Sequence, residues 1–188
     1  MTKSNFQLPL HYYQDTGDIS PIAFVDADYG GCRDTCCSTS GYIFLMAGGP
    51  VTWSSKHQAT VALSTVKAEY VAMSRCAQQM IWMHSWLDEV EIHHLHPGII
   101  KGNNHGAIAL TKNTKDHGKI KHIDICHHYI CELLEACKII MEQVPSAHDM
   151  LAVLFKKKHN NLFMCKYRIP GKLSFWLIEF IFHKSKDL

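Results

Sequence analysis

The sequence has no hydrophobic run long enough to cross a membrane. Its most apolar stretch, 175–182, is interrupted by Glu179 and is well short of the ~20 residues that a spanning helix needs. The first residues also lack the charged start, apolar centre and small-residue cleavage site of a secretory signal. Together these absences argue against a membrane protein and predict an intracellular chain, in the cytoplasm or the nucleus.

Charge of either sign is scarce, and no disulfide framework is indicated. Charged residues make up 19% of the chain and the formal net charge is +2, so contact with nucleic acid would depend on a local surface. The eight cysteines are scattered through 188 residues of which 47% are hydrophobic. A chain of this length can bury an apolar core, which predicts one main domain with reduced cysteines.

The first third of the sequence contains three short β-prone runs. The apolar run 22–25 ends at Asp26, and the runs 42–47 and 51–53 are separated by two glycines and a proline. Such spacing predicts a buried strand followed by a hairpin.

The clearest helix is predicted over 64–87. This stretch has neither glycine nor proline, its apolar residues recur at helical spacing, and Ser64 or Thr65 can cap its start. We interpret its large apolar residues as core packing with partial exposure rather than as a partner groove; they are Met73, Met80, Trp82, Met83 and Trp86.

The second half alternates strands with helices. The predicted elements are a strand at 99–100, helices over 104–112 and 123–137, a strand over 138–144 and a helix over 145–158. Strands joined through helices pair in parallel, whereas the first three form a meander. The order therefore predicts an α/β fold with a five-stranded mixed sheet flanked by helices.

Acidic residues fall where separate elements begin or end. Asp26 ends the first predicted strand, and Glu69 lies in the first turns of the long helix. Phosphodiester hydrolysis by two metal ions needs carboxylates from several elements that converge on one point. Each acid taken alone is more often a helix cap or a solvated strand end than a metal ligand.

Seven sequence words, in order, closely resemble the RNase H region of copia-type retrotransposon polyproteins. They are VDADYGGC (25–32), STSGY (38–42), GGPVTWSSK (48–56), ATVALST (59–65), AEY (68–70), GAIAL (106–110) and KHIDI (121–125). The resemblance covers about residues 10–157. It implies an RNase H-like fold fused to a reverse transcriptase, with Mg²⁺ and four carboxylates that hydrolyse RNA in RNA/DNA hybrids.

Carried over by position, the resemblance implies an incomplete set of carboxylates. Asp26 and Glu69 match the first two and would be the metal ligands, but Asn103 and Val153 stand where the family has its third and fourth aspartates. An amide oxygen can coordinate Mg²⁺ without charge, and valine offers no ligand. We therefore expect weakened Mg²⁺ binding and lost hydrolysis, unless Asp28 or Asp149 substitutes.

The resemblance also implies contact with the hybrid near Ser64, Thr65, Asn104 and His105. Lysines could add phosphate contacts, although scattered lysines more often form a solvated face; the relevant ones are Lys56, Lys101, Lys112, Lys115, Lys119 and Lys121.

Two other functions stay open. One is a non-catalytic nucleic-acid-binding protein or a decayed transposon-derived protein. The other is zinc binding through cysteine and histidine side chains, which lack the paired spacing of two zinc knuckles; they are Cys32, Cys36, Cys37, His122, Asp124, Cys126, His127, His128 and Cys131.

Three segments are expected along the chain. Residues 1–20 are interpreted as a remnant of the connection between reverse transcriptase and RNase H, 21–158 as the RNase H-like domain, and 159–188 as a divergent tail. From 174 onwards the composition matches nothing in the family. We hypothesise read-through, a frameshift or a splice into unrelated sequence.

Overall fold

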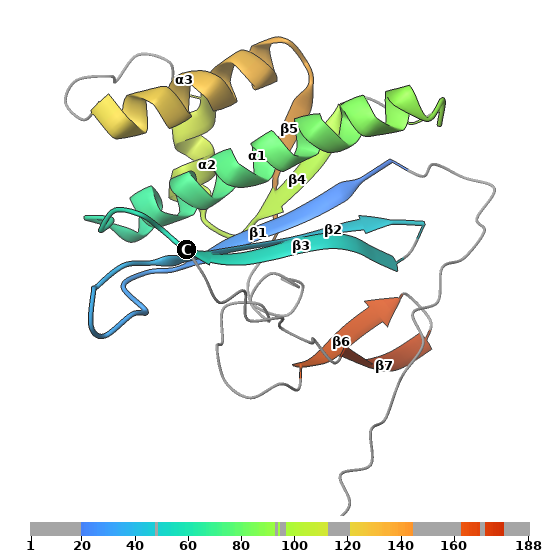
Figure 1. Ribbon diagram of the computed structural model, residues 1–188, viewed down its shortest axis with the longest axis horizontal. Coiled ribbons are helices and arrows are strands. Elements are labelled where there is room, and N and C mark those ends of the chain that lie inside the picture. The colour runs from blue at the N-terminus through green and yellow to red at the C-terminus, as the bar shows by residue number, and fades with distance from the viewer. Residues whose placement is uncertain are drawn as a thin grey trace, which may run out of the picture.

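The structure is a computed structural model that describes residues 20–47, 49–92, 94, 97–112 and 121–144, together with the backbone of two later strands. A five-stranded sheet carries the three described helices on one face (Figure 1). The strands are β1 (Ile22–Asp28), β2 (Thr39–Met46), β3 (Gly49–His57), β4 (Gly98–Gly102) and β5 (Ile139–Gln143). The helices are α1 (Thr65–Glu89), α2 (His105–Lys112) and α3 (Lys121–Glu135).

The strand order in the sheet is β3-β2-β1-β4-β5. The first three strands form an antiparallel meander, whereas β4 pairs in parallel with β1 and β5 pairs in parallel with β4. Parallel neighbours need a crossover, and α1 leads from β3 to β4 while α2 and α3 lie between β4 and β5. This confirms the predicted α/β fold with a five-stranded mixed sheet.

Helix α1 forms because a continuous set of helix-compatible residues follows a capping serine. Ser64 has an extended backbone, and its hydroxyl accepts a hydrogen bond from the Lys67 backbone N–H. Ser64 is thus the N-cap, and Thr65 is the first helical residue. Of the five large apolar residues, Met73, Met80 and Met83 are buried in the core, whereas Trp82 and Trp86 are exposed.

The core lies between α1 and the sheet. Val25 of β1 is fully buried there, and β4 approaches the helix closely because it offers glycines. A Cβ atom on Gly98 would lie 2.6 Å from the sulfur of Met80, and one on Gly102 would lie 2.9 Å from the terminal methyl of Met73. The parallel half of the sheet therefore depends on small residues beneath α1.

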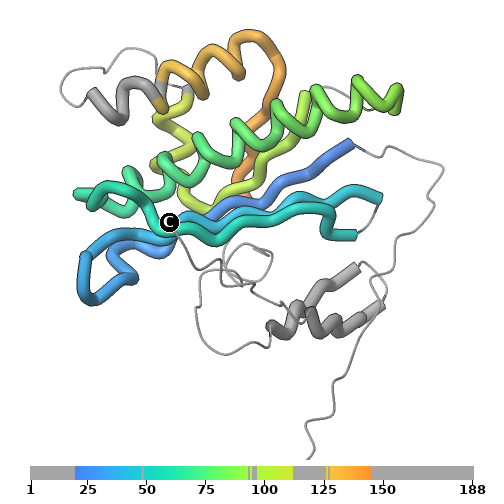
Figure 2. The backbone as a smooth tube through the Cα atoms, viewed as in Figure 1, coloured from blue at the N-terminus to red at the C-terminus, as the bar shows by residue number. Residues whose placement is uncertain are grey.

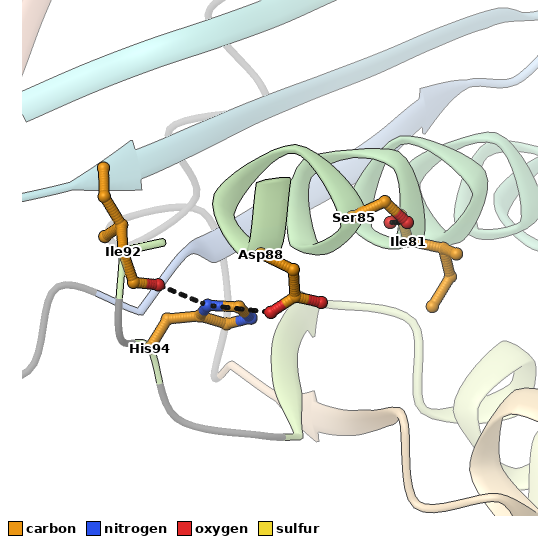
Figure 3. A network of polar contacts seen from close by, with 5 residues as sticks. All are labelled: Ile81, Ser85, Asp88, Ile92 and His94. Carbon is orange, nitrogen blue, oxygen red and sulfur yellow. Dashed lines mark hydrogen bonds and ion pairs between the residues drawn. The ribbon is translucent and has the colours of Figure 1, made fainter. Parts of the chain in front are cut away.

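The chain turns back to the sheet directly after α1. The Ile92 backbone N–H donates to the Leu87 carbonyl over 2.9 Å. The Nδ1 atom of His94 lies 3.1 Å from the Ile92 carbonyl oxygen and 3.9 Å from a carboxylate oxygen of Asp88 (Figure 3). These contacts hold the end of α1 against the segment that leads to β4.

Most boundaries differ from the prediction by a few residues. The largest differences are in the meander, where β1 continues through Asp28 and β3 begins at Gly49 and ends at His57. Inter-strand hydrogen bonds extend these strands across polar residues that carry no apolar signal. Asp26 therefore lies within β1 and does not end it, which corrects the prediction.

Two strands near the C-terminus do not match a predicted element. The predicted helix over 145–158 lies outside the described residues. Beyond it, where we predicted no regular element, the backbone forms two antiparallel strands, β6 (Phe163–Ile169) and β7 (Lys172–Ile178), in a separate two-stranded sheet. Among the described residues, no helix combines the length and hydropathy needed to cross a membrane.

Candidate functional site

The candidate site lies where three elements meet. In Figure 2 the C-terminal ends of β1 and β4 and the N-terminal end of α1 are on the same side of the molecule. β1 and β4 stay paired up to Val25 and Gly102. Asp26 and Asn103 directly follow these two residues in the sequence. The backbone therefore brings together the residues at the first and third carboxylate positions that the resemblance implies.

Asp26 is fully buried in this region. Its register partner on β2 is Gly41, so the neighbouring strand places no side chain directly beside the carboxylate. One carboxylate oxygen accepts a hydrogen bond from the Ala27 backbone N–H over 2.9 Å. Strand alternation turns Asp26 away from the face on which Val25 packs under α1.

Glu69 belongs to the second turn of α1 and is 7% exposed. The adjacent residue, Ala68, is held by Gln58, whose side-chain nitrogen donates to the Ala68 carbonyl over 2.8 Å and to the Ser40 hydroxyl over 2.9 Å. Ser40 is the register partner of Ala27. Gln58 therefore fixes the start of α1 against the strands on which Asp26 lies.

Gln58 was not identified from the sequence. It lies inside a family-like segment, between SSK and ATVALST, but outside the quoted words. The signal that could have found it is a single amide among small and polar residues just before a helix start, since a buried amide there can bridge backbone groups.

The N-terminus of α2 completes this region of the molecule. The side-chain oxygen of Asn104 accepts a hydrogen bond from the Ala107 N–H over 2.9 Å, so Asn104 caps α2. A Cβ atom on Gly106 would lie 3.2 Å from a methyl of Val66 in the first turn of α1. The two helix N-termini are thus in contact.

The four predicted nucleic-acid-binding residues lie at these two helix N-termini. Ser64 and Asn104 cap α1 and α2, while Thr65 and His105 are their first helical residues and are exposed. The structure brings the four residues together at two adjacent helix N-termini. Backbone N–H groups at such ends favour phosphate.

Asp28 ends β1, and its carboxyl group lies beside Gly31 in the following loop. It shares the strand face of Asp26 by alternation, but a Cβ atom on Gly31 would overlap the Asp28 carboxyl group. The Asp28 side chain therefore folds over its own loop. Val153 and Asp149, the fourth predicted position and its substitute, lie outside the described residues.

The described residues contain no group of three or more histidine, cysteine, aspartate or glutamate side chains that could hold a metal ion. Of the predicted zinc ligands, Cys131 is buried and its thiol points to the Thr111 carbonyl over 3.7 Å. The side chains of His122, Asp124 and His127 lie outside the described part. Zinc binding gains no support from the rest.

Two of the proteins that this chain resembles are Pol polyproteins of transposons. The chain is 34% identical over 153 residues to the retrovirus-related Pol polyprotein from transposon TNT 1-94 of Nicotiana tabacum, which covers 80% of this chain and 11% of that protein. It is 37% identical over 134 residues to the Pol polyprotein from transposon RE1 of Arabidopsis thaliana, covering 71% and 9%. The chain thus spans about a tenth of these relatives.

The fold has a matching solved structure. LC11-RNase H1, isolated from compost, superimposes with a TM-score of 0.54 over 73% of this chain and 92% of that one, at 12% identity. No protein-family model matches the chain. At this identity the likeness concerns the fold alone.

Proposed function

Because the chain belongs with the Pol polyproteins of copia-type retrotransposons and has an RNase H-like fold, we propose that its domain binds RNA/DNA hybrid without hydrolysing it. The observation that supports the loss of hydrolysis is the pairing of β1 with β4 up to Val25 and Gly102, the residues that directly precede Asp26 and Asn103. A neutral amide stands where the resemblance implies an aspartate.

The side chains at this point do not fit a two-ion centre. Two Mg²⁺ ions ~4 Å apart repel each other by roughly 16 kcal/mol at an effective dielectric near 20, and several carboxylates must offset this repulsion. Asp26 is turned away from the sheet face that α1 covers, whereas Glu69 lies on α1, and Asn103 supplies no charge. The described residues hold no group of three or more potential metal-binding side chains. No hydrolytic step is therefore assigned to this chain.

Binding of the hybrid needs fewer groups than its hydrolysis and no metal ion. The paired N-termini of α1 and α2 present backbone N–H donors, with Thr65 and His105 exposed beside them. Helix N-termini of this kind attract phosphate groups without any metal. Retention of both caps supports a hybrid-binding role for this surface.

The test incubates the whole chain with a labelled RNA/DNA hybrid and Mg²⁺ or Mn²⁺, beside the double variant Asn103→Asp with Val153→Asp. We expect the unaltered chain to bind and not to cleave, and the double variant to gain cleavage. Cleavage by the unaltered chain that Asp26→Asn abolishes would overturn the proposal. Binding is measured by fluorescence anisotropy, and absence of hybrid binding would also overturn it.

A further inference from the structure

A groove lies between α1 and the strands β2 and β3, away from the helix N-termini. Its volume is about 510 Å³. Two adjacent cross-strand pairs form one wall, Ser40 with Lys56 and Tyr42 with Ser54. The other wall is a single face of α1 at helical spacing, consisting of Arg75, Gln78, Gln79 and Trp82.

Among the described residues that line this groove, Lys56 and Arg75 are charged and none is an aspartate or glutamate. Arg75 is fixed near the end of β3, because one guanidinium nitrogen donates to the His57 carbonyl over 3.4 Å. The groove is therefore suited to an anion, with one cation on each wall.

The groove also offers an aromatic surface. Trp82 is 59% exposed, although it is a large apolar side chain on a helix whose other face forms the core. An exposed indole in the same groove as two cations matches the way in which proteins bind unpaired bases, by stacking on the ring while phosphates contact lysine and arginine. Gln78 and Gln79 add amide groups that can bond base edges.

We propose that this groove binds single-stranded nucleic acid, with a base stacked on Trp82 and the backbone phosphates at Lys56 and Arg75. A duplex fits poorly, because its bases are stacked on each other and cannot reach the indole. An acidic peptide would satisfy the two cations but would leave the indole without a planar partner. An unpaired strand uses both features.

The groove adjoins the candidate site through one residue. Ser40 lines the groove, and its hydroxyl also accepts the hydrogen bond from Gln58 that fixes the start of α1. An unpaired strand that leaves a hybrid at the helix N-termini can thus continue along α1. Binding in the groove does not depend on hybrid binding, so the two proposals can fail separately.

The test measures anisotropy of labelled oligo(dT) and oligo(U) of about 15 nucleotides, near the upper end of the site sizes that single-strand binders use. Trp82→Ala is expected to weaken binding at least about five-fold, the lower end of the usual loss of one stacked base. Trp86→Ala is the matched control, since Trp86 is 44% exposed one turn further along α1 and does not line the groove. Trp82→Phe should keep most of the affinity.

The charged pair is tested by salt dependence. Lys56→Gln with Arg75→Gln removes two phosphate contacts and should reduce the slope of log K against log salt by about 1.4. Lys138→Gln is the control, because Lys138 is exposed just before β5 and does not line the groove. An unchanged slope, or equal losses in Trp82→Ala and Trp86→Ala, overturns the proposal. So does absence of binding by the unaltered chain, or equal competition by polyglutamate.

Discussion

The side-chain nitrogen of Gln58 donates a hydrogen bond to the Ala68 carbonyl over 2.8 Å. This contact joins the end of the meander to the turn of α1 that carries Glu69. Gln58 is 3% exposed and bonds Ser40 through the same nitrogen. The position of the second predicted carboxylate, Glu69, thus depends on an uncharged residue eleven positions earlier.

Gln58→Leu should lower the free energy of unfolding by about 1–3 kcal/mol, because the Ala68 carbonyl and the Ser40 hydroxyl would lose a partner inside the protein. Urea denaturation of the variant gives the value. Gln78→Leu is the control, since Gln78 is exposed on α1 and should change stability by less than about 0.5 kcal/mol. Equal effects of the two changes would show that the bridge contributes nothing.

A second prediction separates the two residues that the sequence offered as caps. Ser64→Ala should cost about 1 kcal/mol, because the Lys67 N–H loses its acceptor. Ser64→Asp should keep the stability, since aspartate is an equally good cap.

Thr65→Ala provides the comparison for Ser64, because Thr65 is exposed and is the first residue inside α1. It should leave the melting temperature nearly unchanged. A larger loss from Thr65→Ala than from Ser64→Ala would contradict the assignment of the cap.

The sheet could be predicted because its signals are local and independent. The short β-prone runs of the meander, the stretch without glycine or proline that forms α1 and the apolar pair at 99–100 each indicated one element. Connection rules then fixed parallel pairing for β4 and β5. The strand limits were less accurate, because hydrogen bonds to a neighbouring strand carried β1 through Asp26 to Asp28.

The site was predicted less completely for a physical reason. Asp26 and Glu69 were found because acids in family-like words are conspicuous. The role of Gln58 follows from contacts between segments distant in sequence, which no spacing rule reports. The same holds for Asp28, which folds over Gly31 although strand alternation alone puts it on the face of Asp26.

Stability above pH 10 should depend on Tyr70. Burial raises the pKa of the Tyr70 hydroxyl above its ordinary value near 10, so the folded state keeps the proton while the unfolded state loses it. The unfolded state then binds fewer protons, and the free energy of unfolding falls as pH rises above ~10. Below that pH the contribution is fully present.

The check for Tyr70 is urea unfolding between pH 9 and pH 11, values chosen around the ordinary tyrosine pKa of ~10. Tyr70→Phe should reduce the loss of stability by up to about 1.4 kcal/mol per pH unit. Tyr29→Phe is the control, because Tyr29 is 48% exposed and meets similar solvent in both states. Burial also raises the pKa of the Cys76 thiol, so part of the alkaline loss should remain in Tyr70→Phe.

Cys32 should be the faster of two contrasting thiols to react. A hydrogen bond from the Thr35 side chain, followed by backbone hydrogen bonds from Thr35 and Asp34, lowers the pKa of the Cys32 thiol, whereas burial raises that of Cys76. The thiolate is the reactive form. Iodoacetamide at pH 8 should therefore modify Cys32 first, as followed by mass spectrometry of peptides.

Thr35→Val removes the leading cause of the lowered Cys32 pKa while keeping the shape of the side chain. The turn itself is held by the Cys36 N–H, which donates to the Cys32 carbonyl over 2.8 Å, so the loop should stay folded. Alkylation of Cys32 should slow in this variant, and the pH at half-maximal rate should rise because less thiolate is present at a given pH. Loss of the Thr35 hydroxyl without any change in the pH profile would assign the reactivity of Cys32 to exposure alone.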